Sequence, residues 1–364
     1  MTIALKPTTQ PLPQAQREAI LADPGFGRHF TDHMVTIEWT EGRGWHDAQL
    51  VPYGPLQLDP ATMALHYDQE IFEGLKAYLR EDGSIATFRP EMNARRFQRS
   101  AARLAMPELP EDLFLEAIGA LVQQDQSWVP TEPEMSLYLR PFMFSSEVGL
   151  GVKPANSYLF LLIASPAGAY FHGGVQPVSV WLSNEYVRAV PGGTGEAKCA
   201  GNYAASLIAQ AQAAREGCDQ VVWLDANERR WIEEMGGMNL YFVYGEGAGA
   251  RLVTPTLTGA LLPGVTRDSL LAVAADLGIA ASQERVSVEQ WQQGNADGSI
   301  SEVFACGTAA VITPVGTVKS TTASWSVGNE EPGPVTLRLR QHLLDLQHGR
   351  VKDTHDWMRE LVAP

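Results

Sequence analysis

A segment rich in proline and glycine, residues 165–174, separates two strand-like runs in this 364-residue sequence. The first run ends at Ala164, and the second covers residues 178–182. Clusters of proline and glycine mark connections, because neither residue favours the interior of a helix or strand. A chain of this length also exceeds what one hydrophobic core usually serves, so we predict two domains. The predicted parts are a first domain, residues 1–167, an interdomain loop, residues 168–180, and a second domain, residues 181–364.

The first domain has the patterns of a mixed α+β fold. Residues 34–39 alternate between apolar and polar side chains, as a half-buried strand does. Residues 92–104 repeat apolar side chains at the spacing of one helix face. We therefore expect both kinds of element before the interdomain loop.

The second domain alternates predicted helices and strands. Residues 202–216 have a helical pattern closed by Gly217, and residues 220–224 and 239–244 are strand-like. The glycine-rich residues 245–249 superficially resemble a dinucleotide-binding loop, but a strand pattern follows them and such a loop must begin a helix. We predict a hairpin turn there, and the fold class is α/β.

Charge and apolar patterning exclude several classes of function. The sequence has 42 acidic and 27 basic residues, whereas a surface for nucleic acid or anionic membranes needs clustered lysine and arginine. The longest apolar run, residues 158–164, is too short to span a bilayer. Residues 1–16 lack a signal-peptide core and a transit-peptide pattern, so we expect a cytoplasmic protein.

Three cysteines, Cys199, Cys218 and Cys306, lie beside apolar or glycine residues without Cys-x-x-Cys spacing. A disulfide framework or zinc site is therefore not expected, and the compartment is predicted to be reducing. Walker A, His-Glu-x-x-His and Gly-x-Ser-x-Gly motifs are absent from the sequence. We predict a protein without a metal.

Lys198 is the first candidate for chemistry. Glycine, alanine and cysteine surround it, which leaves room for a planar ligand beside its amine. A desolvated lysine loses its charge more easily and becomes a nucleophile toward carbonyls. The alternative is a surface-loop lysine before a helix.

Two segments are candidates for binding phosphate. Residues 261–268 lead into a helical pattern ended by Gly278, so the amides of Val265 and Thr266 would lie at a helix start that attracts anions. In residues 305–310 a strand pattern ends in small residues that include Thr308. Each signal alone is weak, because Gly-Thr pairs are common at helix starts.

Glu234 is an acidic residue inside the largely apolar residues 231–239. A recessed lysine, a carboxylate and a phosphate cradle are the parts that a pyridoxal phosphate site requires. The carboxylate would keep the ring nitrogen protonated, so that the ring can accept electrons from a substrate carbanion.

The order of these segments resembles the branched-chain amino acid aminotransferases of fold-type IV, in the eukaryotic-like subgroup. The similarity extends from about Phe30 to about Met358. It is carried by Leu65-His66-Tyr67, Ile71-Phe72-Glu73-Gly74, Phe88-Arg89-Pro90 with Arg96, Ser136-Leu137-Tyr138-Leu139-Arg140-Pro141, Gly168-Ala169-Tyr170-Phe171, Lys198 with Gly201-Asn202-Tyr203, Glu234 with Met238-Asn239, Leu262-Pro263-Gly264-Val265, and Gly307-Thr308-Ala309.

The resemblance implies a small α+β domain, a larger domain with a barrel-like mixed sheet, and pyridoxal 5'-phosphate between them. Lys198 would be the Schiff-base lysine and proton shuttle, and Glu234 would pair with the ring nitrogen. Tyr203 would donate to the phenolic oxygen of the cofactor, although core packing is its alternative role. The implied phosphate-binding residues are Arg96, Val265, Thr266 and Thr308. Only the family pattern selects Arg96 from its neighbours Arg95 and Arg99.

The resemblance also implies a substrate pocket with apolar walls. Its side chains would be Phe30, Tyr67, Phe72, Tyr138 and Tyr170. The amides of Thr308 and Ala309 would bind the α-carboxylate. Arg140 and the hydroxyls of Tyr67 and Tyr138 would bind the γ-carboxylate of glutamate by hydrogen bonding. The expected reaction moves the amino group between L-leucine, L-isoleucine or L-valine and 2-oxoglutarate. Each aromatic residue alone has core packing as its alternative.

Family members are homodimers whose pockets share residues across subunits, so a homodimer is expected. This chain has residues 310–313 where animal members have a redox-sensing Cys-x-x-Cys, and Gly237 where they have threonine. Oxidative regulation is therefore not expected, and one cofactor hydrogen bond is in doubt. Alternative functions are a D-amino acid aminotransferase, an aminodeoxychorismate lyase or a catalytically idle binding protein.

Overall fold

The computed structural model describes residues 2–168 and 175–364. The chain forms two compact units. Unit 1 comprises Met1–Ala169, Ala197–Ala200 and Leu344–Pro364, and unit 2 comprises Tyr170–Glu196 and Gly201–Leu343. The predicted division placed the short segment around Lys198 and the C-terminal segment in the second domain. They lie in unit 1 because Ala197 and Cys199 join its hydrophobic core and the last strand pairs with its sheet.

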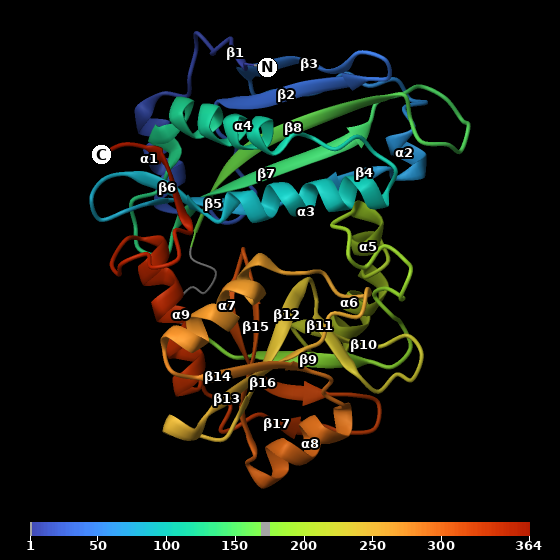
Figure 1. The fold of residues 1–364 in the computed structure, drawn as a ribbon, viewed down its shortest axis with the longest axis vertical. Coiled ribbons are helices and arrows are strands. Elements are labelled where there is room, and N and C mark those ends of the chain that lie inside the picture. The colour runs from blue at the N-terminus through green and yellow to red at the C-terminus, as the bar shows by residue number, and fades with distance from the viewer. Residues whose placement is uncertain (1, 169–174) are drawn as a thin grey trace. The chain divides into compact units, whose positions relative to one another are not determined.

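Unit 1 is built on a nine-stranded, mainly antiparallel sheet with the order β1-β3-β2-β8-β7-β5-β6-β18, and β4 pairs with β7 (Figure 1). Its strands are β1 (Ala4–Leu5), β2 (His33–Thr40), β3 (Gly44–Pro52), β4 (Glu70–Phe72), β5 (Leu75–Leu79), β6 (Ile85–Phe88), β7 (Ser136–Ser145), β8 (Ser157–Ala167) and β18 (Met358–Val362). Its helices are α1 (Gln14–Ala22), α2 (Ala64–Tyr67), α3 (Pro90–Arg103), α4 (Glu111–Gln124) and the 3-10 turn η1 (Gln126–Trp128).

Helices α3 and α4 lie on one face of this sheet (Figure 1). Aromatic side chains contribute to their packing. Phe97 of α3 lies 5.7 Å from Phe114 of α4 and 5.7 Å from Phe160 of β8, measured between ring centroids. Ala94, Phe97 and Ala101 repeat along the buried face of α3, which confirms the predicted helix. This packing fixes α3 against the strands that carry the site.

Strand β8 runs to Ala167, so the prediction that this strand ends at Ala164 was wrong. Residues up to Ala167 pair with β7, whereas pairing with β2 on the other side ends at Leu162. Beyond Leu162 that side of β8 is bonded by residues outside any strand, since Thr31 N–H donates to the Ala164 carbonyl and Gly168 N–H donates to the Gly25 carbonyl. Pro166 therefore lies where no strand pairs with that side. The proline thus marks where pairing with β2 has ended, while β8 continues beside β7.

Unit 2 contains a closed six-stranded barrel. The ring is β11-β10-β9-β16-β15-β12, and it closes because β11 also pairs with β12. Its strands are β9 (Val178–Ser183), β10 (Gln220–Leu224), β11 (Ile232–Met235), β12 (Met238–Tyr244), β15 (Ile300–Gly307) and β16 (Val311–Lys319). The sheet extends through β13 (Arg251–Pro255), β14 (Ala280–Glu284) and β17 (Ser324–Ser326). The predicted barrel-like mixed sheet is confirmed.

Local predictions in unit 2 were right in part. Strands β12 and β13 pair antiparallel around the 3-10 turn η2 (Gly247–Gly249), which confirms the hairpin. The single helix predicted over residues 202–216 was wrong, because the structure has α5 (Ala200–Ala204) and α6 (Leu207–Arg215). Between them the Ser206 hydroxyl donates to the Tyr203 carbonyl at 2.7 Å and competes with the helical ladder. The other helices are α7 (Val265–Asp276), α8 (Val288–Asp297) and α9 (Pro334–Gln347).

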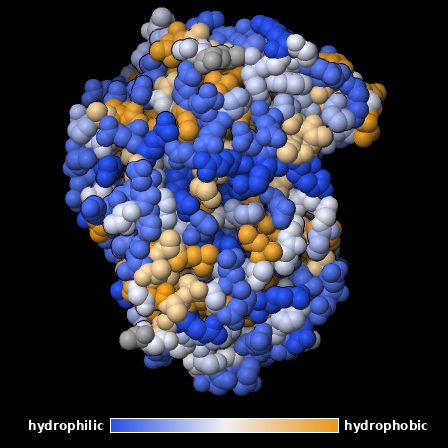
Figure 2. All heavy atoms as spheres, in the orientation of Figure 1, coloured by the Kyte–Doolittle hydropathy of each residue, from blue (hydrophilic) through white to orange (hydrophobic). Residues whose placement is uncertain are grey.

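The visible face of the molecule is mostly hydrophilic, with small hydrophobic patches (Figure 2). None of the helices in the described parts of the chain is long and apolar enough to cross a membrane.

Candidate active site

Lys198 is fixed by its backbone to two elements of unit 1. Its N–H donates to Ser100 Oγ of α3 at 2.9 Å, and its carbonyl accepts from the Phe72 N–H of β4 at 2.9 Å. Its neighbour Cys199 bridges Ile71 and is buried. Lys198 itself is half-buried.

Three residues predicted for the site meet beside Lys198 in unit 1. Lys198 Nζ lies 4.7 Å from the centre of the Phe72 ring, and the Arg140 guanidinium lies 5.0 Å from the same ring. Arg140 Nη2 donates to the Tyr138 hydroxyl at 3.3 Å. Tyr138 and Arg140 share one face of β7 because they are two residues apart in a strand. Residues that are far apart in the sequence thus form a cationic, aromatic group.

The Tyr138 hydroxyl requires glycine at position 74. A Cβ on Gly74 would lie 2.0 Å from this oxygen, so another residue there would displace the tyrosine. Gly74, in the segment Phe72-Glu73-Gly74, therefore leaves the space that the Tyr138 hydroxyl occupies, because glycine has no Cβ.

Arg96 and Glu73 form a buried ion pair behind this group. Arg96 Nε donates to Glu73 Oε1 at 2.7 Å and Nη2 donates to Oε2 at 2.8 Å, and Asn93 Nδ2 also donates to Oε2 at 2.8 Å. Burial alone would raise the pKa of Glu73, but the charge of Arg96, its hydrogen bonds and the charge of Lys198 hold this pKa below its usual 4.5. Glu73 is thus an ionised carboxylate inside the unit.

Glu73 was not among the predicted site residues. The signal was present, since it is an acidic residue in the apolar run Ile71-Phe72-Glu73-Gly74-Leu75. The same reasoning had selected Glu234.

In unit 2, Glu234 of β11 is oriented by three groups and is 1% exposed. Its Oε1 accepts from the Leu262 N–H at 2.6 Å and from Asn239 Nδ2 at 3.2 Å. Its Oε2 lies 2.9 Å from Nε of Arg188, which is also buried. Arg188 in turn donates to the Ala260 carbonyl at 2.6 Å. These contacts favour the ionised form of Glu234 and fix its direction.

Helix α7 of unit 2 begins beside this carboxylate. Asn239, which contacts Glu234, also donates to the Leu262 carbonyl at 3.0 Å, and a Cβ on Gly264 would lie 2.0 Å from Asn239 Oδ1. Gly264 is the N-cap and no side chain caps the helix. The amides of the first turn, at Val265 and Thr266, therefore have the arrangement that binds anions.

Other predicted residues of unit 2 lie at element ends. Tyr203 lies in α5, and a Cβ on Gly237 would lie 3.7 Å from its hydroxyl oxygen. Thr308 and Ala309 are half-buried in the turn between β15 and β16. Cys306, which precedes this turn, is buried, and burial raises the pKa of its thiol.

Phe30 and Tyr67 have other neighbours in unit 1. The Phe30 ring stacks on Tyr53 with 5.1 Å between centroids. The Tyr67 hydroxyl donates to the Leu150 carbonyl at 2.5 Å and so faces the loop between β7 and β8. Tyr170, the fifth predicted pocket residue, lies outside the described residues.

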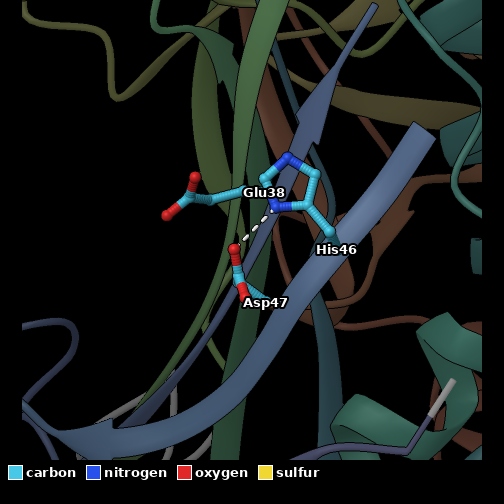
Figure 3. A group of neighbouring side chains, drawn as sticks. All are labelled: Glu38, His46 and Asp47. Carbon is cyan, nitrogen blue, oxygen red and sulfur yellow. Dashed lines mark hydrogen bonds and ion pairs between the residues drawn. The ribbon is translucent and has the colours of Figure 1, made fainter. Parts of the chain in front are cut away.

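Among the described residues, one group has side chains that could bind a metal. It consists of Glu38, His46 and Asp47 on β2 and β3 (Figure 3). Both ring nitrogens of His46 are already used, because Nδ1 lies 2.8 Å from Asp47 and Nε2 lies 3.0 Å from Thr40 Oγ1. The expectation of a protein without a metal stays a prediction.

The comparisons with known proteins agree with one another. Residues 70–318 match the family model of amino-transferase class IV. The chain is 68% identical over 99% of both chains to a probable branched-chain-amino-acid aminotransferase of Streptomyces coelicolor. It is 61% identical to the branched-chain-amino-acid aminotransferase of Mycolicibacterium smegmatis, over 97% of this chain and 96% of that one.

Solved structures give the same family. The branched-chain amino acid aminotransferase of Escherichia coli is 30% identical with a TM-score of 0.74, over 89% of this chain and 99% of that one. The T.th. branched-chain amino acid aminotransferase with pyridoxamine 5'-phosphate is 29% identical with a TM-score of 0.72, over 89% and 98% of the two chains. The chain belongs to the class IV aminotransferases, which depend on pyridoxal 5'-phosphate.

Proposed function

We propose that this class IV aminotransferase moves the amino group between L-leucine, L-isoleucine or L-valine and 2-oxoglutarate. The observation that carries the proposal is the buried, fixed Glu234 carboxyl group, which contacts Arg188 in the unit whose helix α7 has no side-chain cap. An oriented carboxylate and an anion-binding helix start are what the ring nitrogen and phosphate of pyridoxal phosphate require. The residues present therefore fit this cofactor.

The cofactor, when bound, accepts electrons from the substrate carbon that loses its proton. Glu234 would hold the proton on the ring nitrogen, and Tyr203 would donate to the phenolic oxygen. The phosphate would be bound by Arg96, by Thr308 and by the amides of Val265 and Thr266. Gly237 gives no hydroxyl, so the contact that a threonine would make there is missing.

Lys198 has two roles in this proposal. Its amine would hold the cofactor between turnovers, and once released it would move the proton between the substrate Cα and C4′ of the cofactor. Its backbone contacts with Ser100 and Phe72 keep the chain in place while the amine moves.

The substrate side chain is proposed to lie against aromatic residues, because burial of branched aliphatic groups on them is favourable. The proposed set is Phe30, Tyr67, Phe72, Tyr138 and Tyr170. Arg140 donates to the γ-carboxylate of glutamate, together with the hydroxyls of Tyr67 and Tyr138, and the amides of Thr308 and Ala309 donate to the α-carboxylate. The relatives named as branched-chain enzymes support this choice of substrates.

The working form is proposed to be a homodimer with pocket residues shared across subunits. The loop between β7 and β8 in unit 1 exposes Val148, Leu150 and Val152 at 56%, 75% and 84%. Tyr67, a proposed pocket residue, donates to this loop and is itself 39% exposed. Exposed apolar residues gathered around a pocket residue fit a surface that a second copy covers. Leu150→Asp is expected to give a monomer with reduced activity by light scattering and assay.

We propose a cytoplasmic location, because the three cysteines are buried free thiols, which suits a reducing compartment. The alternative functions on this fold are D-amino acid transamination and aminodeoxychorismate cleavage.

The proposal is tested by glutamate formation from 2-oxoglutarate with each L-amino acid and with D-alanine as a rival amino donor, and by pyruvate release from aminodeoxychorismate. Turnover of L-leucine, its loss in Lys198→Ala and its retention in the control Lys6→Ala are expected. Pyruvate release from aminodeoxychorismate, or turnover of D-alanine alone, would replace the proposed reaction by a rival one.

A further inference from the structure

Arg267 of unit 2 is a buried cation that meets only neutral groups. It is the third residue of α7 and is 4% exposed. Its Nε donates to Thr254 Oγ1 at 3.2 Å, and its Nη2 donates to the Pro255 carbonyl at 2.9 Å and to Gln283 Oε1 at 2.8 Å. Within the described parts of the chain, these acceptors are a hydroxyl, a carbonyl and an amide.

Two buried carboxylates of unit 2, Glu234 and Glu302, have compensating partners. Glu234 is paired with Arg188, and the Glu302 carboxylate accepts from the Val335 N–H, the Thr336 N–H and the Thr336 hydroxyl at the start of α9. A buried charge without a counter-charge is costly, and proteins usually avoid it. Among residues 2–168 and 175–364 no carboxylate pairs with Arg267, so its positive charge favours an anion nearby.

The charge of Arg267 acts on two buried groups of unit 2, Cys306 and Tyr241. Burial raises the pKa of the Cys306 thiol on β15 and of the Tyr241 phenol on β12, and the charge of Arg267 opposes both shifts. Cys306 lies two residues before Thr308, and Arg267 lies two residues after Val265. One proposed phosphate-binding segment therefore contains Arg267, and the other follows Cys306, whose pKa responds to the charge of Arg267.

We propose that Arg267 is the buried counter-charge of the cofactor phosphate, acting through the protein interior without touching it. This inference rests on the proposed function. The first-turn amides of α7 would make the contacts, and the guanidinium would add a positive potential to the helix dipole at the same end. In a water-excluded interior such a charge is weakly screened, so its effect on a phosphate is larger than that of a surface arginine.

A purely structural role is the competing account. The three hydrogen bonds of Arg267 also tie α7 to β13 and β14, and their loss would loosen the helix. A loosened helix would lower the affinity for every ligand of the site. Loss of a counter-charge would lower the affinity only for ligands that carry the phosphate. Pyridoxal, which lacks the phosphate, therefore separates the two accounts.

The test measures binding of pyridoxal phosphate, pyridoxal and inorganic phosphate to the full chain stripped of cofactor. The variant is Arg267→Gln, and the control is Arg251→Gln on β13, which removes the same charge from an exposed residue paired with Glu284. In Arg267→Gln we expect affinity for pyridoxal phosphate to fall about tenfold, or about 1.4 kcal/mol, while pyridoxal changes less than about twofold. Protection of the stripped protein by inorganic phosphate against heat is expected to fall too.

Equal losses for pyridoxal phosphate and pyridoxal, or no loss for either, would overturn the inference. If Arg267→Gln does not fold, Arg267→Lys decides. This variant keeps the charge and changes the hydrogen bonds, so the ratio of the two affinities is expected to stay near that of the native protein, and a tenfold fall in that ratio would contradict the proposal. Failure of the native protein to bind pyridoxal phosphate would instead remove the proposed function.

Discussion

Replacement of Glu73 by glutamine is expected to destabilise unit 1 strongly. Glu73 has no exposed surface and Arg96 is 4% exposed, and two hydrogen bonds join them at 2.7 and 2.8 Å. Glutamine keeps the shape but not the charge, so Arg96 would stay buried without its counter-charge. Breaking a buried ion pair from one side costs about 3–5 kcal/mol.

The chain supplies a matched control, an exposed ion pair whose arginine lies on the same helix, α3, as Arg96. Arg95, the neighbour of Arg96, pairs with Glu111 at 3.0 Å, and these side chains are 56% and 32% exposed. Glu111→Gln changes the net charge equally but breaks a solvated pair, for which about 0.2–1 kcal/mol is usual. The difference between the two variants isolates the effect of burial.

The assay is hydrogen exchange of the α3 amides as a function of denaturant, because the two units need not unfold together. The free energy of opening of α3 is expected to fall much more in Glu73→Gln than in Glu111→Gln. The folded pKa of Glu73 is lowered, so its contribution is present above its ordinary value of 4.5 and is lost as pH falls below that value. Equal effects in both variants, or a Glu73→Gln effect under about 1 kcal/mol, would refute this reasoning.

Three further predictions concern unit 2 and the thiols. Gly264→Ala brings a Cβ to 2.0 Å from Asn239 Oδ1, so affinity for pyridoxal phosphate by equilibrium dialysis is expected to fall at least about tenfold, and unchanged affinity would contradict the proposed cradle. Burial, with the charges of Glu234 and Asp225, raises the pKa of Glu233 to about 7 from 4.5, so this carboxyl favours folding below pH 4.5 and opposes it as pH rises to 7. Glu233→Gln should therefore add about 2 kcal/mol at pH 8 and little at pH 5 in denaturant unfolding, and the reverse order would be inconsistent with that pKa. Because all three cysteines are buried, a thiol reagent is expected to react slowly with the native protein and rapidly once urea unfolds it, and rapid native reaction accompanied by inactivation would reveal a thiol switch.

Local sequence patterns predicted elements whose hydrophobic face decides their structure. The apolar repeat through Ala94, Phe97 and Ala101 gave α3, and the turn before β13 followed from glycine and the strand pattern after it. The break between α5 and α6 was missed, because the apolar spacing continues through it while the Ser206 hydroxyl contacts the Tyr203 carbonyl. The end of β8 was missed because a proline is tolerated where only one side of the strand pairs with another strand.

The sequence predicted which residues belong to the candidate site but not the contacts that those residues make. The sequence and the family resemblance selected Lys198, Glu234 and Arg96, but the partners Glu73 and Arg188 depend on contacts between distant segments. Local spacing cannot distinguish Arg96 from Arg95, yet one is buried on Glu73 and the other is solvated beside Glu111. Arg267 was noticed only as part of a helix start, since an arginine that lacks a carboxylate partner is visible only in three dimensions.

The most direct test of the proposed reaction is the visible spectrum of the purified protein during addition of L-leucine and then 2-oxoglutarate. We expect a yellow absorption band that L-leucine removes and 2-oxoglutarate restores, because the amino group passes through the cofactor in both half-reactions. A yellow protein that does not respond to L-leucine would contradict the proposed substrates. A protein that stays colourless after addition of pyridoxal phosphate would contradict the assignment of Lys198 and Glu234 to the site.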